Sequence, residues 1–461
     1  MKWEAHAMQR AVKLGDDTAA RPSVQAQRRG LLNAQRRSPV KIALLGFGTV
    51  GASVAKALAA LAPLDIQLSH IHNRQIAHKR ASDAALCAPQ DVVWTEDFEA
   101  ILRSDASIVV ELIGGVDPAK SWIERSLAAG KSVVTANKQV IASHGLELAA
   151  LAASKGVSLL YGAAVAGGVP VIPGMLQGLS GDEVTRLSGI LNGTCNYILS
   201  RMEQGARYAA VLADAQRLGY AEADPVADVG GFDARAKLCI LCRIAMHVAI
   251  DPEAIATQSI AAIDAVDFAY AKELGCTIRQ VSRAQVQGAG LYARVAPMLV
   301  PLASPLAWSH GTQNMVVATG RFAGDVVFSG HGAGGDATAV AVLSDLVTIA
   351  RGTQFAPLPV TQKLVTGDSV APHYLRFIVN DGPGIVADIA GALAKVGANI
   401  DSLLQRPGYP KDRLAFVVTT EPCSNAVIEQ AMDAIAQLDC MLMRPLSLEV
   451  LVVDDKDEAT A

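Results

Sequence analysis

The sequence predicts an α/β protein that begins with a doubly wound parallel sheet, continues with an α+β region and ends with a βαββαβ module. Two observations carry this prediction. Short apolar runs alternate with helical stretches over residues 41–155, as in a parallel sheet covered by helices. After a stretch containing Pro and Gly at residues 354–372, the pattern changes to a new set of strands and helices.

The composition favours a globular protein with sizeable apolar cores. Hydrophobic residues make up 51% of the chain, and the formal net charge of −4 argues against general nucleic-acid binding, which favours a concentrated basic surface. No uninterrupted apolar run of about 18 residues is present, so no membrane span is expected. Of the seven scattered Cys, only Cys239 and Cys242 have CxxC spacing, and they sit in the apolar helical run LCILCRIAMHVAI; we therefore expect reduced thiols in a cytoplasmic protein.

Residues 1–39 have a basic bias and little apolar periodicity, and we expect a disordered N-terminal extension. The continuous apolar core of a secretory signal is missing. An organelle transit peptide is an alternative that the acids Glu4, Asp16 and Asp17 disfavour, and Met8 is an alternative start.

A glycine motif follows the first predicted strand. The sequence KIALLGFGTVG places Gly46, Gly48 and Gly51 between a buried strand and a helical stretch. The first glycine permits a tight turn, the second lets backbone approach a pyrophosphate, and the third lets helix and strand pack closely. Free N–H groups around Thr49 and Val50 at the helix start would bind the phosphates. The motif predicts a Rossmann-type dinucleotide-binding domain.

The second predicted strand leads to a cation instead of the usual acid. An Asp or Glu about 20 residues after the glycines binds the ribose of NAD. The corresponding sequence, IQLSHIHNRQIAHKR, places Arg74 there, with Lys79 and Arg80 behind it. A guanidinium binds a 2′-phosphate in bidentate fashion. We expect a preference for NADP(H), with NAD(H) as the alternative; a merely solvated Arg74 is the structural alternative.

Two further predicted strands end in candidate cofactor contacts. Residues 107–113 form a buried strand that ends at Gly114 and Gly115, and the short strand KSVVTANK carries Thr135 and Lys138. Ligands of a parallel sheet bind at the carboxyl ends of its strands. A helix is then expected from about His144. Lys138 by itself would more often be a solvated loop residue.

The densest group of charges lies in residues 215–237, AQRLGYAEADPVADVGGFDARAK. Lys237 follows Asp233 by four residues, so a helix would place both on one face. A carboxylate in that position can hold an ammonium and set its proton affinity. The structural alternative is an exposed ion pair at a helix start.

This stretch resembles the homoserine dehydrogenase family, and the resemblance covers about residues 41–453. The positions of the family pattern are filled by Gly219, Asp224, Pro225, Asp228, Gly231, Asp233 and Lys237. The resemblance implies reversible reduction of L-aspartate 4-semialdehyde to L-homoserine by NAD(P)H, in the biosynthesis of threonine, methionine and isoleucine. A catalytically silent protein that binds nucleotide and amino acid is the alternative, and a dehydrogenase of a related aldehyde is a third possibility.

The resemblance also assigns roles to residues. Lys237 would donate the proton and Asp233 would orient it, with Lys138 near both cofactor and substrate. Glu222 would bind the substrate ammonium, supported by Asp228. The other expected substrate contacts are Gly193, Thr194 and Tyr220.

Cys195, in the motif NGTCN, allows a different chemistry. A thiolate at a helix start can accept an acyl group, which would indicate an aspartate-semialdehyde dehydrogenase. The homoserine dehydrogenase interpretation needs no nucleophile.

The sequence LLYGAAVAGGVPVIP resembles the family loop whose carbonyls hold a monovalent cation. The matching carbonyls belong to Val165, Gly167 and Val169, whereas Gly162 stands where most members carry Glu. An oxygen-only cation site weakens when an anionic ligand is lost. We therefore expect a weak or altered dependence on Na⁺ or K⁺.

The resemblance sets the domain boundaries. Residues 164–331 would bind substrate and form the dimer interface of a homodimer or homotetramer. Residues 331–351, HGAGGDATAVAVLSDLVTIAR, would return to the nucleotide-binding domain. That domain would therefore combine residues 40–163 with about 332–360.

The C-terminal module, residues 372–453, resembles ACT domains, which bind amino acids. Its order is βαββαβ, with DGPG before the first helix and GANI after it. L-threonine is the expected inhibitor, and a purely structural dimer module is the alternative. The expected effector contacts are Asn380, Asp381, Gly384 and Asn399.

Overall fold

The first sheet of the computed structural model is parallel, with strand order β3-β2-β1-β4-β5-β6. The structure describes residues 39–61, 65–353 and 359–452, so the expectations for residues 1–38 lie outside it. The strands are β1 (Val40–Leu45), β2 (Ile66–His72), β3 (Val93–Thr95), β4 (Ile108–Glu111), β5 (Ser132–Thr135) and β6 (Leu159–Leu160). The strand order reverses beside β1, where doubly wound sheets bind their ligands. This confirms the predicted fold class.

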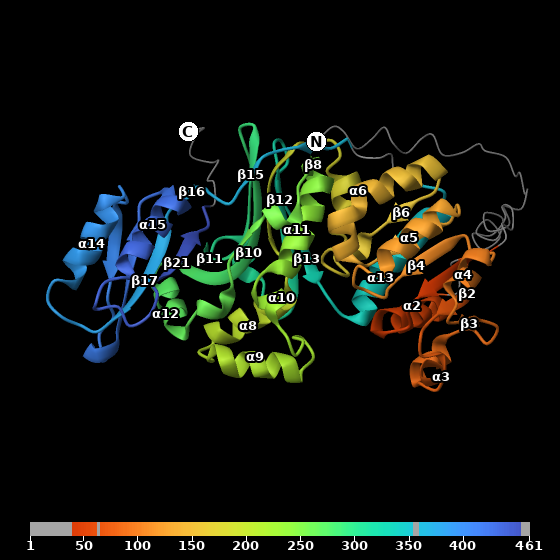
Figure 1. The fold of residues 1–461 in the computed structure, drawn as a ribbon, viewed down its shortest axis with the longest axis horizontal. Coiled ribbons are helices and arrows are strands. Elements are labelled where there is room, and N and C mark those ends of the chain that lie inside the picture. The colour runs from red at the N-terminus through yellow and green to blue at the C-terminus, as the bar shows by residue number, and fades with distance from the viewer. Residues whose placement is uncertain (1–38, 62–64, 354–358, 453–461) are drawn as a thin grey trace, which may run out of the picture. The chain divides into compact units, whose positions relative to one another are not determined.

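Helices cover both faces of this sheet (Figure 1). Alternate side chains of β1 enter different cores: Ile42 and Leu44 face one layer, and Ala43 and Leu45 face the other. The elements are α2 (Thr49–Ala60), α3 (Ile76–Arg80), η1 (Asp83–Cys87), α4 (Phe98–Arg103), α5 (Ala119–Ala128) and α6 (Lys138–Lys155).

Helix α6 begins earlier than the sequence suggested. The expected start near His144 is wrong, because α6 begins at Lys138. The side chain of Asn137 accepts a hydrogen bond from the Val140 N–H at 3.2 Å and caps the helix. Lys138 is therefore a first-turn helical residue that follows directly from the carboxyl end of β5.

The second sheet has 11 strands, nine of which follow the order β13-β12-β7-β10-β11-β21-β17-β19-β18. Its first part contains β7 (Val184–Ile190), β10 (Cys276–Gln287), β11 (Gly290–Pro301), β12 (Gln313–Gly320) and β13 (Gly324–His331), with β9 (Ala256–Thr257) and β15 (Val365–Thr366) beside β11. Strands β10 and β11 are 12 residues each and pair antiparallel along their whole length.

Eight helical segments lie between β6 and β10 in the described chain, apart from the minor elements given below. They are η2 (Gly162–Ala164), α7 (Val171–Pro173), η3 (Gly174–Gly178), α8 (Gly193–Glu203), α9 (Tyr208–Arg217), α10 (Val226–Val229), α11 (Phe232–Ala245) and α12 (Ala265–Glu273). Minor elements are β8 (Val248–Ala249), η4 (Pro252–Ala254), η5 (Ile260–Ala262) and η6 (Pro305–Trp308).

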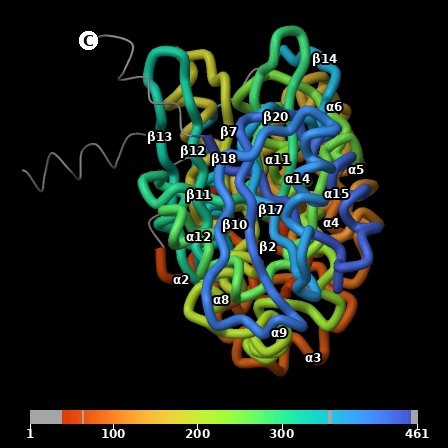
Figure 2. The backbone as a smooth tube through the Cα atoms, turned by 90° about the vertical axis from the view of Figure 1, so that its left-hand side faces the viewer, coloured from red at the N-terminus to blue at the C-terminus, as the bar shows by residue number. Residues whose placement is uncertain are grey.

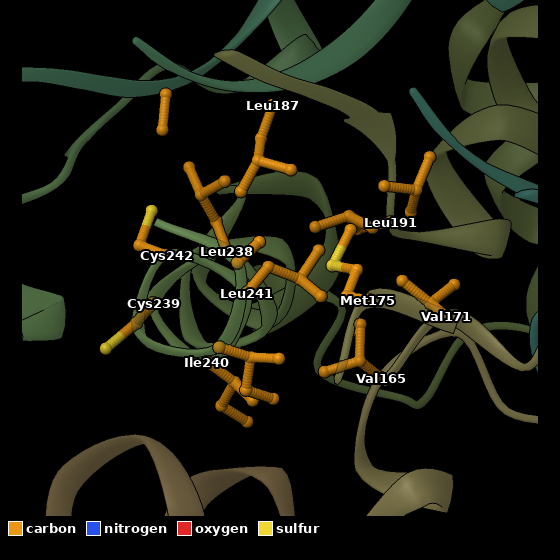
Figure 3. Close-up of a cluster of buried hydrophobic side chains, with 14 of the residues drawn as sticks. Val165, Val171, Met175, Leu187, Leu191, Leu238, Cys239, Ile240, Leu241 and Cys242 are labelled. Carbon is orange, nitrogen blue, oxygen red and sulfur yellow. The ribbon is translucent and has the colours of Figure 1, made fainter. Parts of the chain in front are cut away.

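Helix α11 is fixed by a large apolar core. Figure 3 shows Leu238 and Leu241 of this helix among Leu187, Leu191 and Met175. Residues 238–242 are all at most 1% exposed, so this part of the helix is enclosed on every side. The closely packed apolar core around residues 238–242 therefore fixes the position of the charged first turns of α11.

Helix α13 (Gly335–Ala350) returns the chain to the first sheet. A Cβ at Gly335 would lie 2.6 Å from Ser53 Oγ of α2, which shows how closely the two helices approach. Ser53 Oγ donates to Asp336 Oδ1 at 2.8 Å, and Lys56 Nζ donates to Asp336 Oδ2 at 2.9 Å. These contacts hold α13 against α2, a helix of the first sheet.

The C-terminal module has the predicted βαββαβ order: β17 (His373–Val379), α14 (Ile385–Lys395), β18 (Ile400–Leu404), β19 (Leu414–Thr420), α15 (Asn425–Ile435) and β21 (Leu446–Val450). Figure 2 shows α14 and α15 beside β17. The remaining short elements are β14 (Thr361–Gln362), β16 (Val370–Ala371), η7 (Lys411–Arg413) and β20 (Cys423–Ser424).

The sequence did not indicate how this module joins the rest of the second sheet. Strand β21 pairs in parallel with β11, with Met298 opposite Glu449 and Leu299 opposite Val450. One hydrogen-bonded sheet therefore runs from β13 to β18. Within the described ranges, no helix has both the length and the apolar character needed to cross a bilayer.

Candidate active site

Asp233 lies between two lysines that come from different parts of the fold. Its Oδ2 accepts a hydrogen bond from Lys237 Nζ at 2.8 Å, and its Oδ1 is 2.9 Å from Lys138 Nζ. Asp233 and Lys237 are on α11, whereas Lys138 starts α6 beside the first sheet. This carboxylate therefore joins the carboxyl edge of the nucleotide sheet to the helix of the charged motif.

The charges in this cluster stabilise one another. Burial alone would raise the pKa of Asp233, but Lys237 and Lys138 hold that pKa well below its ordinary value. The charge of Asp233, followed by Asp228 and Glu222, raises the pKa of Lys138 against the opposing effect of burial. Asp233 and Lys138 are therefore both ionised at neutral pH.

Lys237 is directed into the protein and not towards bulk water. Its side chain is 11% exposed. Besides the bond to Asp233, its Nζ donates to the carbonyl oxygen of Leu191 at 2.7 Å. The predicted pairing of residues 233 and 237 on one helical face is confirmed, and the exposed ion pair considered as its alternative is not observed.

Asn192 is a member of the cluster that sequence reasoning missed. Its Nδ2 donates to Asp228 Oδ1 at 2.7 Å and to Asp233 Oδ2 at 2.9 Å. Its Oδ1 accepts from the Cys195 N–H at 2.8 Å and caps α8. An Asn before a helix predicts a cap, but the sequence holds no signal that its amide also bridges two acids far along the chain.

The expected substrate contacts around this cluster differ in their exposure to solvent. Burial raises the pKa of Asp228. Thr194 Oγ1 donates to the carbonyl oxygen of Tyr220 at 2.6 Å, so that hydroxyl proton is already used inside the protein. The Tyr220 ring is partly exposed and contacts Tyr197 edge to face. Gly193 is closely packed, because a Cβ there would lie 2.8 Å from the carbonyl oxygen of Thr312.

Glu222 occupies the solvent side of the same site. It is exposed and lies between α9 and α10. Its charge contributes to the raised pKa of Lys138, after the larger effects of Asp233, burial and Asp228, so its carboxylate is within electrostatic reach of that lysine.

Cys195 does not have the environment of a nucleophile. Its side chain is fully buried, and its Sγ donates to the carbonyl oxygen of Asp228 at 3.2 Å. Burial raises the pKa of this thiol far above its ordinary value. Reactive cysteines need the opposite shift and partial exposure, so the structure disfavours covalent catalysis at Cys195.

The glycine motif has the geometry that a pyrophosphate requires. Gly46 has φ +99°, and a Cβ at Gly51 would lie 2.4 Å from the Gly46 carbonyl oxygen. A Cβ at Gly48, in contrast, would meet no described protein atom within 4 Å, so this side is open to a ligand. The residue before α2 is Gly48, which has no side chain to cap the helix, and this leaves N–H groups around Thr49 and Val50 for an anion. These residues fit a dinucleotide.

A buried acid, Glu111, shapes the neighbouring strand ends. It accepts hydrogen bonds from the Ile113 N–H at 2.8 Å, the Gly114 N–H at 3.2 Å and Thr135 Oγ1 at 2.6 Å. Gly114 and Gly115 both have φ +71° and turn away from β4. Thr135 is buried, so it supports this turn and does not itself face solvent. Glu111 was not anticipated, because in the sequence it looks like the polar end of an apolar strand.

Arg74 lies two residues beyond the end of β2 and is exposed. Strand β2 is the neighbour of β1, which carries the glycine turn. Arg74 is therefore on the side of the sheet where the ribose of a dinucleotide lies in this fold.

The loop expected to hold a cation is buried, with left-handed backbone at Ala166 and Gly167 (φ +56° and +50°). Val165 and Val169 are at most 3% exposed, and the Val169 carbonyl accepts from the Val171 N–H at 2.7 Å. The carbonyl oxygens of this loop are suitable ligands for a hard monovalent cation. Upstream, the Gly162 N–H donates to Asp345 Oδ2 at 2.7 Å.

A pocket of about 460 Å³ lies in the C-terminal module. Its lining includes Asp381, Gly384 and Gln405. The structure does not bring the other two expected effector contacts to this lining. The Asn380 N–H donates to the Cys440 carbonyl, and Asn399 follows the opposite end of α14.

The fold and the site together define a class. A dinucleotide-binding sheet whose carboxyl edge meets a Lys–Asp–Lys cluster around an enclosed carboxylate fits a nicotinamide-dependent oxidoreductase. Comparisons with known proteins identify the family within this class.

The family model for homoserine dehydrogenase matches residues 170–347, the model for the NAD-binding domain of homoserine dehydrogenase matches residues 46–162, and the ACT domain model matches residues 373–440. Homoserine dehydrogenase of Mycobacterium tuberculosis is 39% identical over 428 residues, covering 87% of this chain and 95% of that protein. The Synechocystis homoserine dehydrogenase is 38% identical over 436 residues, covering 89% and 99%.

Solved structures agree with these matches. A homoserine dehydrogenase from Thiobacillus denitrificans superposes with a TM-score of 0.82 at 33% identity, over 90% of this chain and 98% of that one. A hyperthermophilic archaeal homoserine dehydrogenase in complex with NADPH gives 0.59 at 27% identity, over 69% and 99%. The chain therefore belongs to the homoserine dehydrogenase family, with a nicotinamide cofactor domain and a C-terminal ACT domain.

Proposed function

We propose that this protein reduces L-aspartate 4-semialdehyde reversibly to L-homoserine with NADP(H) as the preferred cofactor. The observation that carries the proposal is the position of Asp233 between Lys237 and Lys138, 2.8 and 2.9 Å away. These contacts bring an acid–base pair of α11 next to the start of α6, at the carboxyl edge of the nucleotide sheet. The bound cofactor supplies the hydride, and the residues of the chain bind, orient and protonate the substrate.

Lys237 is the proton donor in this proposal. Two of the three N–H bonds of its ammonium point to Leu191 and Asp233, so one remains for the aldehyde oxygen. As negative charge develops on that oxygen, a fixed ammonium stabilises it and delivers the proton. Asp233 and the Leu191 carbonyl orient the amine, and Lys138 adds positive charge on the cofactor side.

The remaining acids hold the amino-acid end of the substrate. Glu222 is exposed near Lys138 and binds the substrate ammonium, while Asp228 adds a second negative charge. Asn192 keeps Asp228 and Asp233 apart and oriented through its amide. Gly193, Thr194 and Tyr220 form the adjoining wall.

The cofactor preference rests on Arg74, whose guanidinium binds the 2′-phosphate. Gly46, Gly48, Thr49, Val50 and Gly51 receive the pyrophosphate, while Gly114, Gly115 and Thr135 shape the nicotinamide side. Equal affinities for NADPH and NADH would contradict the preference.

The carbonyls of Val165, Gly167 and Val169 hold a monovalent cation in this proposal, and the absence of a carboxylate at Gly162 makes the dependence weak. Activity that disappears when Na⁺ and K⁺ are replaced by tetramethylammonium would contradict this.

L-threonine is proposed as an inhibitor that binds at the C-terminal pocket beside Asp381. The protein is proposed to be a homodimer or homotetramer. Its strand β13 ends the second sheet with alternate side chains exposed, which suits pairing with another copy. Light scattering coupled to size exclusion measures the assembly.

The reaction is tested by following NADP⁺ reduction with L-homoserine, in the parent protein and in Lys237→Ala. We expect turnover in the parent and at least about 10²-fold less in the variant, the lower range for a lost acid–base group, with nucleotide binding unchanged. A parent that binds both ligands without reducing NADP⁺ would indicate the silent regulatory protein. Near-normal turnover in the variant would remove Lys237 from the mechanism.

A further inference from the structure

A second cavity, of about 680 Å³, lies away from the catalytic cluster. Its walls come from α6, β6, α13 and the segment around α7 and η3, and they are mainly apolar, with Leu146, Leu160 and Ile172 among them. Pockets that bind small molecules typically have volumes of about 300–1,000 Å³ and the same largely apolar character. Neither of the catalytic lysines lines it, nor does Asp233.

One charged group in this lining has no counterion among the described residues. Asp345 is 9% exposed, and the hydrogen bonds of the described residues give its carboxylate one partner, the Gly162 N–H at 2.7 Å. The ion pairs of the described residues include none for Asp345. A buried carboxylate that is held by one neutral donor is costly. Burial accordingly raises the pKa of Asp345 to about 7.

The other charged group in the lining, Arg243, is held by backbone carbonyls. Arg243 Nη1 donates to the Ile141 carbonyl and Nη2 to the Ala142 carbonyl, each at 2.8 Å. Its Nε is enclosed and cannot be reached from the cavity. Arg243 is thus directed towards the backbone of α6 and is not among the groups that shift the pKa of Asp345, so a cationic ligand would find a carboxylate that no described cation neutralises.

Tyr161 supplies a further polar group of the lining. Burial raises the pKa of its phenol, so the side chain is neutral near pH 7. Its ring can face an ammonium and its hydroxyl can accept or donate one hydrogen bond. The lining thus combines apolar walls, one carboxylate, one aromatic ring and the guanidinium of Arg243, which backbone carbonyls hold.

We propose that this cavity is a second binding site, which takes a small molecule with an apolar body and a single amino group that pairs with Asp345. The apolar body displaces water from the walls contributed by α6 and β6. The ammonium supplies the counterion that the described residues do not provide. The site is independent of the proposed reaction, because it shares no residue with the Lys–Asp–Lys cluster.

The test uses the full chain and two probes of the same shape, 2-phenylethylamine and the uncharged 2-phenylethanol, measured by calorimetry near pH 8. We expect the amine to bind at least about tenfold more tightly than the alcohol, as expected for a desolvated charge pair. Asp345→Asn, which can still accept from the Gly162 N–H, should remove this difference and leave alcohol binding unchanged. Saturating L-homoserine should not displace the amine.

Two further measurements locate the probe. Ala149→Phe places a ring among the cavity walls and should block both probes, with thermal unfolding used to check that the variant folds. Below about pH 7 the carboxyl group of Asp345 is protonated, so amine affinity should fall between about pH 8 and pH 6. The proposal is overturned if Asp345→Asn binds the amine as tightly as the parent, if L-homoserine displaces it, or if the parent does not bind it.

Discussion

At the scale of single residues, the site depends on one carboxylate whose two oxygens are both used. Asp233 accepts from Lys237 and Asn192 through Oδ2 and lies against Lys138 through Oδ1. A carboxylate in this setting fixes the direction of each donor as well as its charge. The sequence predicted the bond to Lys237, because i,i+4 spacing on a helix is local geometry. It did not predict Asn192, which is 41 residues away.

Replacing Asn192 tests its role as a positioning residue. Asn192→Ala removes the amide that separates Asp228 from Asp233, so we expect kcat to fall by at least about tenfold and its pH profile to shift, because the pKa of each acid changes. The variant also loses the cap of α8, typically about 1 kcal/mol of unfolding free energy.

The matched control for this experiment is Ser424→Ala. Ser424 caps α15 in the C-terminal module by accepting from the Val427 N–H. It should lose a similar amount of stability without any change in kcat or in the pH profile. If both variants kept normal kinetics, Asn192 would be a helix cap only.

At the scale of elements, two glycines at the junction of β1 with α2 have different roles, one in packing and one in ligand contact. A side chain has no room at Gly51 but would meet open space at Gly48, although the two glycines belong to the same motif. The motif indicated these roles from sequence, and the backbone geometry agrees with both.

Two alanine substitutions should therefore have opposite signatures. Gly51→Ala places a methyl group 2.4 Å from the Gly46 carbonyl and should cost about 1–3 kcal/mol of unfolding free energy. Gly48→Ala should change stability by less than about 1 kcal/mol and still weaken NADP⁺ binding, since its methyl group points to the ligand side. Urea unfolding and fluorescence titration measure the two effects. A destabilised Gly48→Ala would contradict the open geometry.

Helix α11 shows how one element serves two purposes. Its first turn carries Asp233 and its second carries Lys237, while residues 238–242 are embedded in the core. The sequence indicated an apolar helical run here. Lys138 reaches Asp233 because α6 lies against α11 and begins at Lys138, directly after the cap residue Asn137. The strand-like sequence before Asn137 concealed this helix start.

At the scale of the whole molecule, the ACT module is built into the second sheet. Glu449 of β21 is buried, accepts from Tyr292 at 3.0 Å and lies 3.6 Å from Arg294, both of β11. Asp267 of α12 forms a buried ion pair with Arg376 of β17 at 2.5 Å. Truncation near Thr366 would therefore expose these charges and remove a paired strand. Point variants are the cleaner test of regulation.

Inhibition by threonine is tested with Asp381→Ala. This variant changes the lining of the 460 Å³ pocket without altering the pairing of β21 with β11. We expect kcat without threonine to be unchanged and the inhibitory concentration of threonine to rise at least about tenfold. Glu429→Ala, an exposed site on α15, is the control and should be inhibited like the parent. Full inhibition of Asp381→Ala would move the effector elsewhere.

The stability of the whole chain should depend on pH through Asp345. Its pKa is raised to about 7 by burial, against an ordinary unfolded value of about 3.9. The folded state therefore holds the proton more tightly, and unfolding free energy falls as pH rises through this window, until the full cost is reached above about pH 7.

Asp345→Asn removes this titration. Relative to the parent, the variant should gain up to about 1.4 kcal/mol for each pH unit across the window, with little difference near pH 4. Urea unfolding at pH 5 and pH 8 measures the gain, and Asp412→Asn, at an exposed site, is the control. An equal difference between variant and parent at both pH values would contradict the assignment.

The sequence by itself determined what local patterns encode: the parallel sheet, the glycine turn, the pairing of residues 233 and 237, and the βαββαβ order at the C-terminus. These follow from side-chain periodicity, from backbone freedom at glycine and from spacing along a helix, all of which act over a few residues. A family resemblance added roles that such patterns alone do not give.

Only the tertiary structure decided which distant groups meet. It brought Lys138 and Asn192 to Asp233, placed Glu111 beneath the turn at Gly114, joined β21 to β11, and left Asp345 buried without a counterion among the described residues. Contacts of this kind depend on how helices and sheets pack, and packing depends on the shapes of whole faces. No spacing along the chain encodes them.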